Sequence, residues 1–232
     1  MDSDRRPPSL QLILILGSLL CLLVTGYSLL RYPAILIPLR TGILFASVFF
    51  LVLLIYGLIT WRLSFSTTTE AVWLARNSLG WGILISIFWF VEIVTGNLSD
   101  TGKTTAQFLY FGATGCALIM SFIAGIWGAK QTGSVRSGTL LGLYGGMISG
   151  LFTFLILMGV TYLFLPTFLQ DPQNVFQFQE SGTTDLTAFV IGDSLAGGIG
   201  HLIIGLVLGL LLGVIGGVVG NILPHGKPNV RS

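Results

Sequence analysis

Charged residues are scarce in this chain. Only 9% of the 232 residues are Asp, Glu, Lys or Arg, and 53% are hydrophobic, whereas about a quarter of an ordinary soluble domain is charged. A water-soluble fold of this size cannot cover its surface with so few charges, so the composition excludes one. The net charge of +2 is spread in ones and twos along the chain, which excludes the concentrated basic patch that nucleic-acid binding needs.

Cysteine and the common catalytic motifs are also rare or missing. Cys21 and Cys116 are the only cysteines and both fall in apolar stretches, so neither a disulfide framework nor a zinc centre is expected. The chain has no Walker loop, HExxH or CxxC motif, and the nearest approach to GxSxG ends in Ala196. The serine of this stretch, Ser194, lies near His201 in the sequence, so an intramembrane hydrolase remains a residual hypothesis. No further residue completes a catalytic triad. We expect no enzyme, no cofactor and no bound metal.

Long charge-poor stretches are what the sequence does contain. Six of them are long enough to cross a bilayer, which takes about 20 apolar residues, and only Glu92 and Asp193 interrupt them. The expected spans are residues 10–30, 42–62, 78–98, 106–129, 139–163 and 202–223. Because lipid cannot satisfy backbone groups and no alternating pattern indicates a barrel, we predict an all-α bundle of six transmembrane helices forming one transmembrane domain, residues 1–232.

The distribution of Lys and Arg predicts the orientation. With a cytoplasmic N-terminus, eight basic residues lie inside and three outside, as the positive-inside rule requires. The inner eight are Arg5, Arg6, Arg62, Arg76, Lys130, Arg136, Lys227 and Arg231, and the outer three are Arg31, Arg40 and Lys103. We therefore expect a multi-pass protein of the cell membrane with both termini in the cytoplasm. Between the second and third spans, residues 64–77 are either a short interfacial helix or a loop.

Small residues recur every four positions in the last three spans. The rows are Ala113, Ala117, Ser121, Gly125 and Ala129 in the fourth, Gly138, Gly142, Gly146 and Gly150 in the fifth, and Gly205, Gly209, Gly213 and Gly217 in the sixth. Residues four apart share one helix face, so each row forms a shallow groove that lets another backbone approach closely. The pattern predicts that these three helices pack tightly together.

The last apolar stretch is longer than one crossing needs. It runs over residues 186–223, which is about 57 Å of helix against a hydrocarbon core of about 30 Å. Because glycines weaken a helix, we expect the last helix to be bent or broken near residues 197–201, so that residues 170–201 form an outer loop and a bent outer segment. The alternative is that residues 186–223 cross twice, giving seven spans and an external C-terminus.

Three ionisable residues lie within or beside the spans. Glu92, Asp193 and His201 all fall toward the outer side, and intramembrane ionisable groups are costly enough to be functional candidates. On an unbroken helix Asp193 and His201 would not touch, yet the three residues can share an outward-facing polar pocket that holds a cation or relays protons.

Two functional hypotheses follow from these features. The first is a small permease-like or channel-like protein with the polar pocket at its outer side. The second is a structural or accessory subunit that binds partner helices through its glycine grooves. The expected partners are the lipid bilayer and either further copies of the chain or other membrane subunits.

Overall fold

The protein is a bundle of long apolar helices. The computed structural model describes residues 10–36, 39–63, 69–98 and 103–223, and in these ranges it contains helices and no strand. Six helices are long and apolar enough to cross a membrane. They are α1 (Leu10–Arg31), α2 (Leu39–Leu63), α3 (Thr69–Leu98), α4 (Lys103–Thr132), α5 (Val135–Leu163) and α8 (Leu186–Ile222). The predicted six-helix membrane bundle is confirmed.

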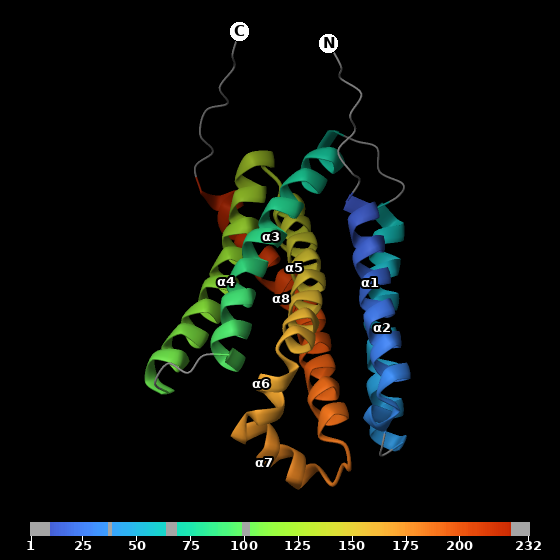
Figure 1. The fold of residues 1–232 in the computed structure, drawn as a ribbon. Helices are drawn as coiled ribbons and strands as arrows, with labels where there is room; N and C mark the ends of the chain where they lie inside the picture. Colours follow the sequence, from blue (N-terminus) through green and yellow to red (C-terminus); the bar gives the residue numbers. More distant parts are fainter. Residues whose placement is uncertain (1–9, 37–38, 64–68, 99–102, 224–232) are drawn as a thin grey trace, which may run out of the picture.

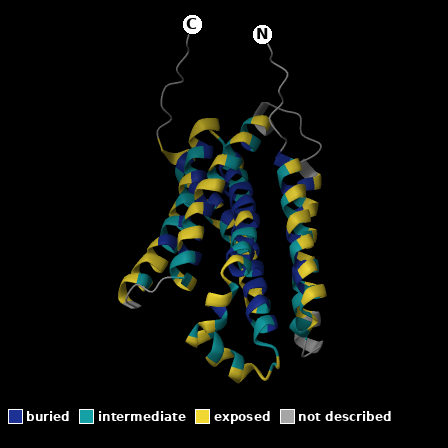
Figure 2. Ribbon diagram, viewed as in Figure 1, coloured by how far each residue is buried: buried dark blue, intermediate teal, exposed yellow. Residues whose placement is uncertain are grey.

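Helix α5 is the centre of the bundle. It packs against α1, α3, α4 and α8, most extensively against α8, and it is buried along most of its length while α1 and α2 expose their outer faces (Figure 2). Helices α1 and α2 lie side by side at the edge of the bundle, and α1 begins at the end where α8 terminates (Figure 1). The remaining helices α3, α4, α5 and α8 therefore form the inner group.

The glycine rows of α5 and α8 face each other. A Cβ atom on Gly146 would overlap the carbonyl oxygen of Gly205, and a Cβ on Gly209 would lie 2.8 Å from the carbonyl oxygen of Gly142. Helix α4 joins the same seam, since a Cβ on Gly125 would lie 2.8 Å from the carbonyl oxygen of Gly213. No side chain fits at these positions, so the absence of Cβ atoms permits the backbones to meet.

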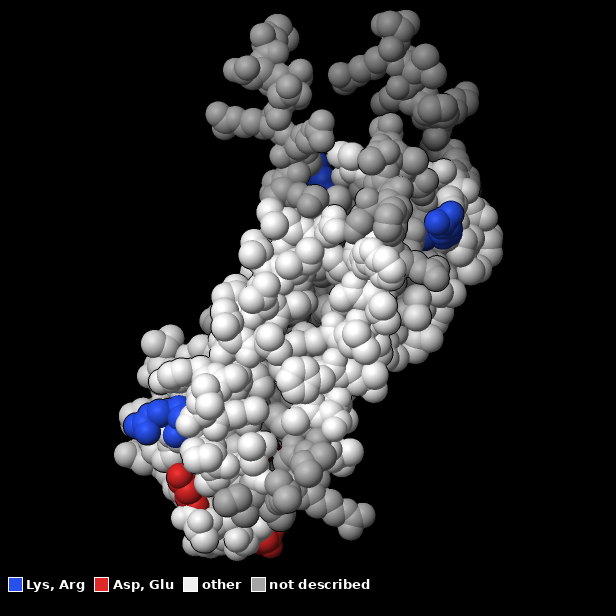
Figure 3. Space-filling model, turned by 90° about the vertical axis from the view of Figure 1, so that its right-hand side faces the viewer, with Lys and Arg blue, Asp and Glu red and all other residues white. Residues whose placement is uncertain are grey.

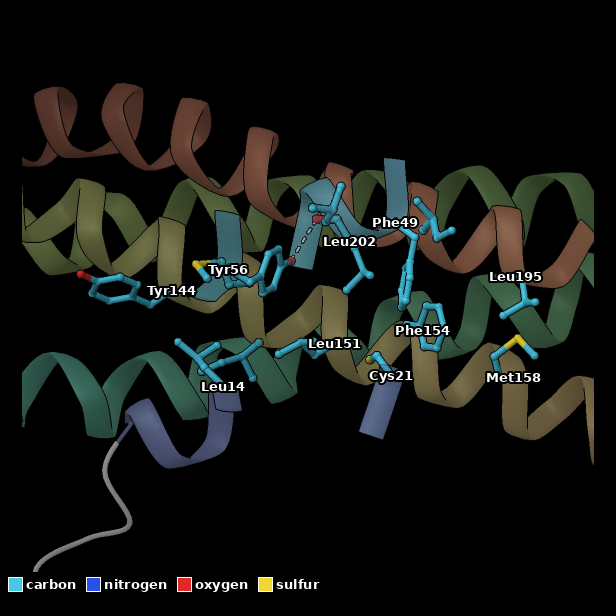
Figure 4. Close-up of a cluster of buried hydrophobic side chains, with 14 of the residues drawn as sticks. Leu14, Cys21, Phe49, Tyr56, Tyr144, Leu151, Phe154, Met158, Leu195 and Leu202 are labelled. Carbon is cyan, nitrogen blue, oxygen red and sulfur yellow. Dashed lines mark hydrogen bonds between the residues drawn. The ribbon is translucent and has the colours of Figure 1, made fainter. Parts of the chain in front are cut away.

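The α1–α2 pair is attached through a buried apolar cluster (Figure 4). Phe49 of α2 stacks on Phe154 of α5 with ring centroids 6.0 Å apart. In the same cluster the Tyr56 hydroxyl donates a hydrogen bond of 2.9 Å to the carbonyl oxygen of Leu202 in α8. Cys21 of α1 is fully buried there, as an apolar packing residue.

The surface between the two ends of the bundle suits a lipid environment. In the face shown in Figure 3, the Lys, Arg, Asp and Glu side chains lie near the ends, and the middle carries none. Large apolar side chains are exposed on the helices, among them Leu23, Phe50 and Leu54. In water such a surface would be unfavourable, whereas in a bilayer it faces lipid. The chain is a polytopic membrane protein.

Helix α8 is continuous over 37 residues, so the break expected near residues 197–201 is absent. The glycines there are supported by packing: a Cβ on Gly198 would lie 2.7 Å from the Phe154 ring, and one on Gly197 would lie 3.3 Å from Leu157. This tertiary contact outweighs the local preference of glycine against helix. One continuous helix cannot reverse direction, so the seven-span alternative is excluded as well.

Helix α3 also differs from expectation. It is uninterrupted from Thr69 to Leu98, so residues 69–77 are neither a separate interfacial helix nor a loop, but the first turns of the third span. Residues 64–68 of the same predicted segment lie outside the described residues.

Two short helices lie across the end of the bundle where α5 ends and α8 begins (Figure 1). They are α6 (Leu165–Gln170) and α7 (Pro172–Ser181), while a short 3-10 helix, η1 (Pro33–Leu36), follows α1. Asp171 caps α7 by accepting a hydrogen bond from the Gln173 N–H, and Asp185 caps α8 through the Ala188 N–H. Gly182, with φ of 69°, ends α7 in the left-handed conformation that favours glycine. The segment predicted as an outer loop is thus largely helical.

Candidate functional site

A polar cavity of about 260 Å³ lies beneath α6 and α7. Its walls come from α3, α4, α5 and α8, and Phe168 of α6 and Asn174 of α7 complete them. Glu92, Asp193 and His201 all line this one cavity. The structure therefore brings together the three ionisable residues that the sequence singled out, one from α3 and two from α8.

Glu92 and His201 form a close pair across the cavity. The His201 Nε2 atom lies 3.8 Å from Glu92 Oε2, and the Glu92 residue is only 7% exposed. The other ring nitrogen, Nδ1, is 2.9 Å from the carbonyl oxygen of Gly197. Because a carbonyl only accepts, Nδ1 donates the hydrogen of this contact, and Nε2 is the ring nitrogen that faces the Glu92 carboxylate. A carboxylate of α3 and an imidazole of α8 thus face each other across the cavity.

Trp89 holds the imidazole from the inner side. The indole and imidazole rings meet edge to face, with centroids 4.9 Å apart and an interplanar angle of 86°. Trp89 itself is buried and lies one helical turn before Glu92 on α3. The orientation of the His201 ring is therefore fixed by the Gly197 carbonyl at Nδ1 and by the Trp89 indole packed against the ring.

Asp193 is the second carboxylate of the cavity. Among the described residues its side chain has no hydrogen-bond or ion-pair partner. It lies two turns before His201 on the unbroken helix, so the two side chains do not contact each other, as their spacing predicts. Both nevertheless face the same cavity. Asp193 is consequently available to a ligand.

Sequence reasoning missed several polar residues of the wall. Tyr110 of α4 is an interaction partner of the Glu92 carboxylate. Asn97 donates a hydrogen bond of 2.8 Å to the Ile93 carbonyl, and Asn174 donates one of 3.0 Å to the Phe168 carbonyl. Tyrosine and asparagine near a span end are typical of membrane interfaces in general, so no sequence signal distinguished these residues from ordinary interfacial ones.

Ser194 has a structural role. Its hydroxyl accepts a hydrogen bond of 2.9 Å from Thr161 and donates one of 3.0 Å to the Val190 carbonyl. The bond from Thr161 joins α5 to α8, and the bond to Val190 lies within α8. With both committed, Ser194 is not presented to His201 as a nucleophile, and the hydrolase hypothesis receives no support from the geometry.

The cavity is acidic. Among the side chains that the structure describes, it is lined by two carboxylates and one histidine and by neither Lys nor Arg. Within the described part of the chain, no group of three His, Cys, Asp or Glu side chains is placed to hold a metal ion. The arrangement favours a small organic cation or a proton over an anion or a chelated metal.

No family model matches this chain, and no curated protein or solved structure matches it. A functional conclusion must therefore come from the chemistry of the cavity.

Proposed function

We propose that the chain is a small permease-like membrane protein that binds a small organic cation in this cavity. The single observation that carries the proposal is the meeting of Glu92, Asp193 and His201 in one cavity of an otherwise apolar bundle. Ionisable groups inside a membrane span are costly and are retained where they contact a substrate or a proton.

The size and charge of the cavity narrow the ligand. About 260 Å³ is below the range of about 300–1,000 Å³ usual for drug-sized ligands, so a simple amine fits better than a larger metabolite. The unpaired Asp193 carboxylate supplies a counter-ion for an ammonium group. Glu92, whose carboxylate lies 3.8 Å from His201 Nε2 in the same cavity, supplies a second counter-ion.

The cavity opens toward the outer side in the proposed topology. The α6–α7 end carries Asp171, Glu180 and Asp185 beside Arg31, the single basic residue there whose side chain the structure describes, while Lys130 and Arg136 lie at the opposite end. The positive-inside rule then places the opposite end in the cytoplasm, with both termini, and the protein in the cell membrane. On the cytoplasmic side the glycine seam of α4, α5 and α8 closes the bundle.

The alternative role as an accessory subunit finds no favourable observation. The rows that would bind partner helices, such as Gly146 on α5 and Gly205 on α8, are in contact with each other within the chain. A groove that is filled by its own neighbour is not available to a partner helix.

The test of the function is ligand-dependent stability in lipid nanodiscs. Ethanolamine, putrescine and choline are the cationic probes, and ethylene glycol and glycolate are the neutral and anionic controls. A ligand present at 100 times its Kd stabilises the folded state by about 2.7 kcal/mol, so at least one amine should raise the melting temperature while the controls do not. Proteoliposomes should then accumulate that radiolabelled amine.

Matched variants connect the effect to the cavity. Glu92→Gln and Asp193→Asn should abolish the shift, whereas Glu180→Gln and Asp185→Asn, whose carboxylates lie outside the cavity, should retain it. The proposal fails if no amine stabilises the protein or if the cavity variants respond like the parent. Binding without uptake would contradict transport and leave only a binding protein.

A further inference from the structure

Trp89 separates the polar cavity from a second, smaller one. The inner cavity has a volume of about 10 Å³ and lies between α3, α4, α5 and α8, farther from α6 and α7. Trp89 lines this inner cavity with one part of its side chain and packs against His201, which lines the outer cavity. The indole is thus a partition between two spaces on the axis of the same four helices.

Ser149 presents an unpaired hydroxyl to the inner cavity. The residue is fully buried in α5, and its Oγ has no hydrogen-bond partner among the described residues. Burying a hydroxyl without a partner is costly, so native proteins almost always satisfy such groups with protein or ordered water. An unsatisfied hydroxyl that lines a cavity indicates that the cavity holds a polar ligand.

Ser121 of α4 offers a second polar group to the same cavity. Its hydroxyl donates a hydrogen bond of 3.0 Å to the Ala117 carbonyl, which leaves its oxygen free to accept one. A buried water needs at least two polar partners and about 10–15 Å³ of cavity. The two serines and the volume of about 10 Å³ meet these requirements for one water molecule, and the space is too small for an organic ligand.

A polar group also lies between the two cavities. Thr153, fully buried in α5, has no hydrogen-bond partner among the described residues. It follows Ser149 by one helical turn and precedes Leu157, which lines the outer cavity, by another. Residues at this spacing share one helix face. The hydroxyl groups therefore continue from the inner cavity toward the outer one along a single face of α5.

We propose that Ser149 and Ser121 bind one water molecule in the inner cavity, and that Trp89 closes the route between this water site and the outer cavity. The Ser149 hydroxyl donates to the water, and the water donates to the Ser121 oxygen. The role of Trp89 as a barrier on a route rests on the proposed function, whereas the water site does not. The site extends the polar path of the cavity toward the middle of the bundle.

Radiolytic hydroxyl-radical labelling in nanodiscs tests the water site. Radicals formed from a bound water modify the side chains that surround it, even when these are buried. Ile85 is 2% exposed and lines the inner cavity, whereas the fully buried Ile191 lines neither cavity. Ile85 should be modified at least several-fold faster than Ile191, and Ser149→Ala should reduce it to the Ile191 rate.

Two results would overturn the water site. Equal labelling of Ile85 and Ile191 in the parent protein would show that no water is bound there. Strong labelling of Ile85 that persists in Ser149→Ala would show that Ser149 does not hold it. Neither result depends on amine binding, so a failure here is distinct from a failure of the proposed function.

Cysteine labelling tests the barrier. In a Cys21→Ala, Cys116→Ala background, Ser149→Cys should react slowly with a water-soluble methanethiosulfonate, and adding Trp89→Ala should raise the rate at least ten-fold. Trp81→Ala removes an indole of the same helix that packs on Trp127 instead, so it should leave the rate unchanged. Trp89→Leu replaces Trp89→Ala if the latter does not elute as a monodisperse protein. Equal rates with and without the indole would contradict the barrier.

Discussion

His201 is held by three contacts within the polar cavity. Its Nδ1 is bonded to the Gly197 carbonyl, its Nε2 faces Glu92 at 3.8 Å, and its ring is packed against Trp89. Together these contacts fix the orientation of the imidazole, with Nε2 directed at the Glu92 carboxylate.

The contribution of His201 to the proposed binding can be measured directly. His201→Phe retains an aromatic ring against Trp89 but has no ring nitrogen to accept a hydrogen bond from an ammonium group, so the amine should raise the melting temperature less than in the parent protein. The control Glu180→Gln should respond like the parent. An undiminished shift in His201→Phe would exclude the histidine from the binding site.

At the scale of elements, we expect the seam between α5 and α8 to determine the stability of the fold. A Cβ on Gly146 or Gly205 would meet backbone of the opposite helix, which cannot rotate away as a side chain can. Gly146→Ala and Gly205→Ala should therefore each destabilise the protein by about 2–3 kcal/mol, the cost of overpacking a core. Thermal unfolding in detergent measures the loss.

Gly200 supplies a matched control on the same helix. A Cβ there would meet nothing within 4 Å, so Gly200→Ala should be neutral or stabilise the protein by about 0.5–1 kcal/mol through helix propensity. If Gly146→Ala is tolerated as well as Gly200→Ala, the two helices can separate at little cost and the seam does not determine stability.

A buried hydrogen bond links α2 to α8 within the apolar cluster. The Tyr56 hydroxyl donates to the Leu202 carbonyl at 2.9 Å from a fully buried position. Tyr56→Phe should cost about 1 kcal/mol, the net value of a typical hydrogen bond, in the same unfolding measurement. Tyr27→Phe, at a tyrosine that is 58% exposed, should change stability by less. Equal effects would mean that the Tyr56 bond adds nothing beyond packing.

The sequence predicted the spans better than it predicted the segments at the α6–α7 end. Charges such as Arg31 and Lys130 mark span ends directly, because moving a charge into lipid is costly. The continuity of α8 was not predictable, since the glycines weaken the helix locally and the packing of Phe154 and Leu157 that supports it comes from another helix. The sequence also indicated the ionisable residues of the cavity, because Glu92, Asp193 and His201 stand out in an apolar sequence. It could not indicate Asn174, which lines the cavity only because α7 folds back over it.

At the scale of the whole molecule, the two ends of the bundle differ in charge. Asp171, Glu180 and Asp185 outnumber the single basic side chain, Arg31, that the structure describes at the α6–α7 end, and Lys130 and Arg136 lie at the other. Since basic loops are retained in the cytoplasm, the acidic cavity is expected to face the cell exterior. The proposed cation would then enter the cavity from outside the cell. If the protein had the opposite orientation in the membrane, the cavity would open to the cytoplasm and the same site would serve export.

Cysteine accessibility in intact cells decides between these orientations. In the Cys21→Ala, Cys116→Ala background, Thr183→Cys lies at the α6–α7 end and Gln131→Cys at the opposite end, and both positions are exposed or partly exposed. A membrane-impermeant maleimide should label Thr183→Cys in intact cells and Gln131→Cys only after permeabilisation, because the basic end stays inside. The reverse pattern would place the opening of the cavity on the cytoplasmic side. Labelling of both positions from one side would contradict an orientation in which the bundle spans the membrane.

In the expected case, external amine should also protect the cavity variant Asn97→Cys from labelling, since the ligand and the reagent reach the same space from the same side.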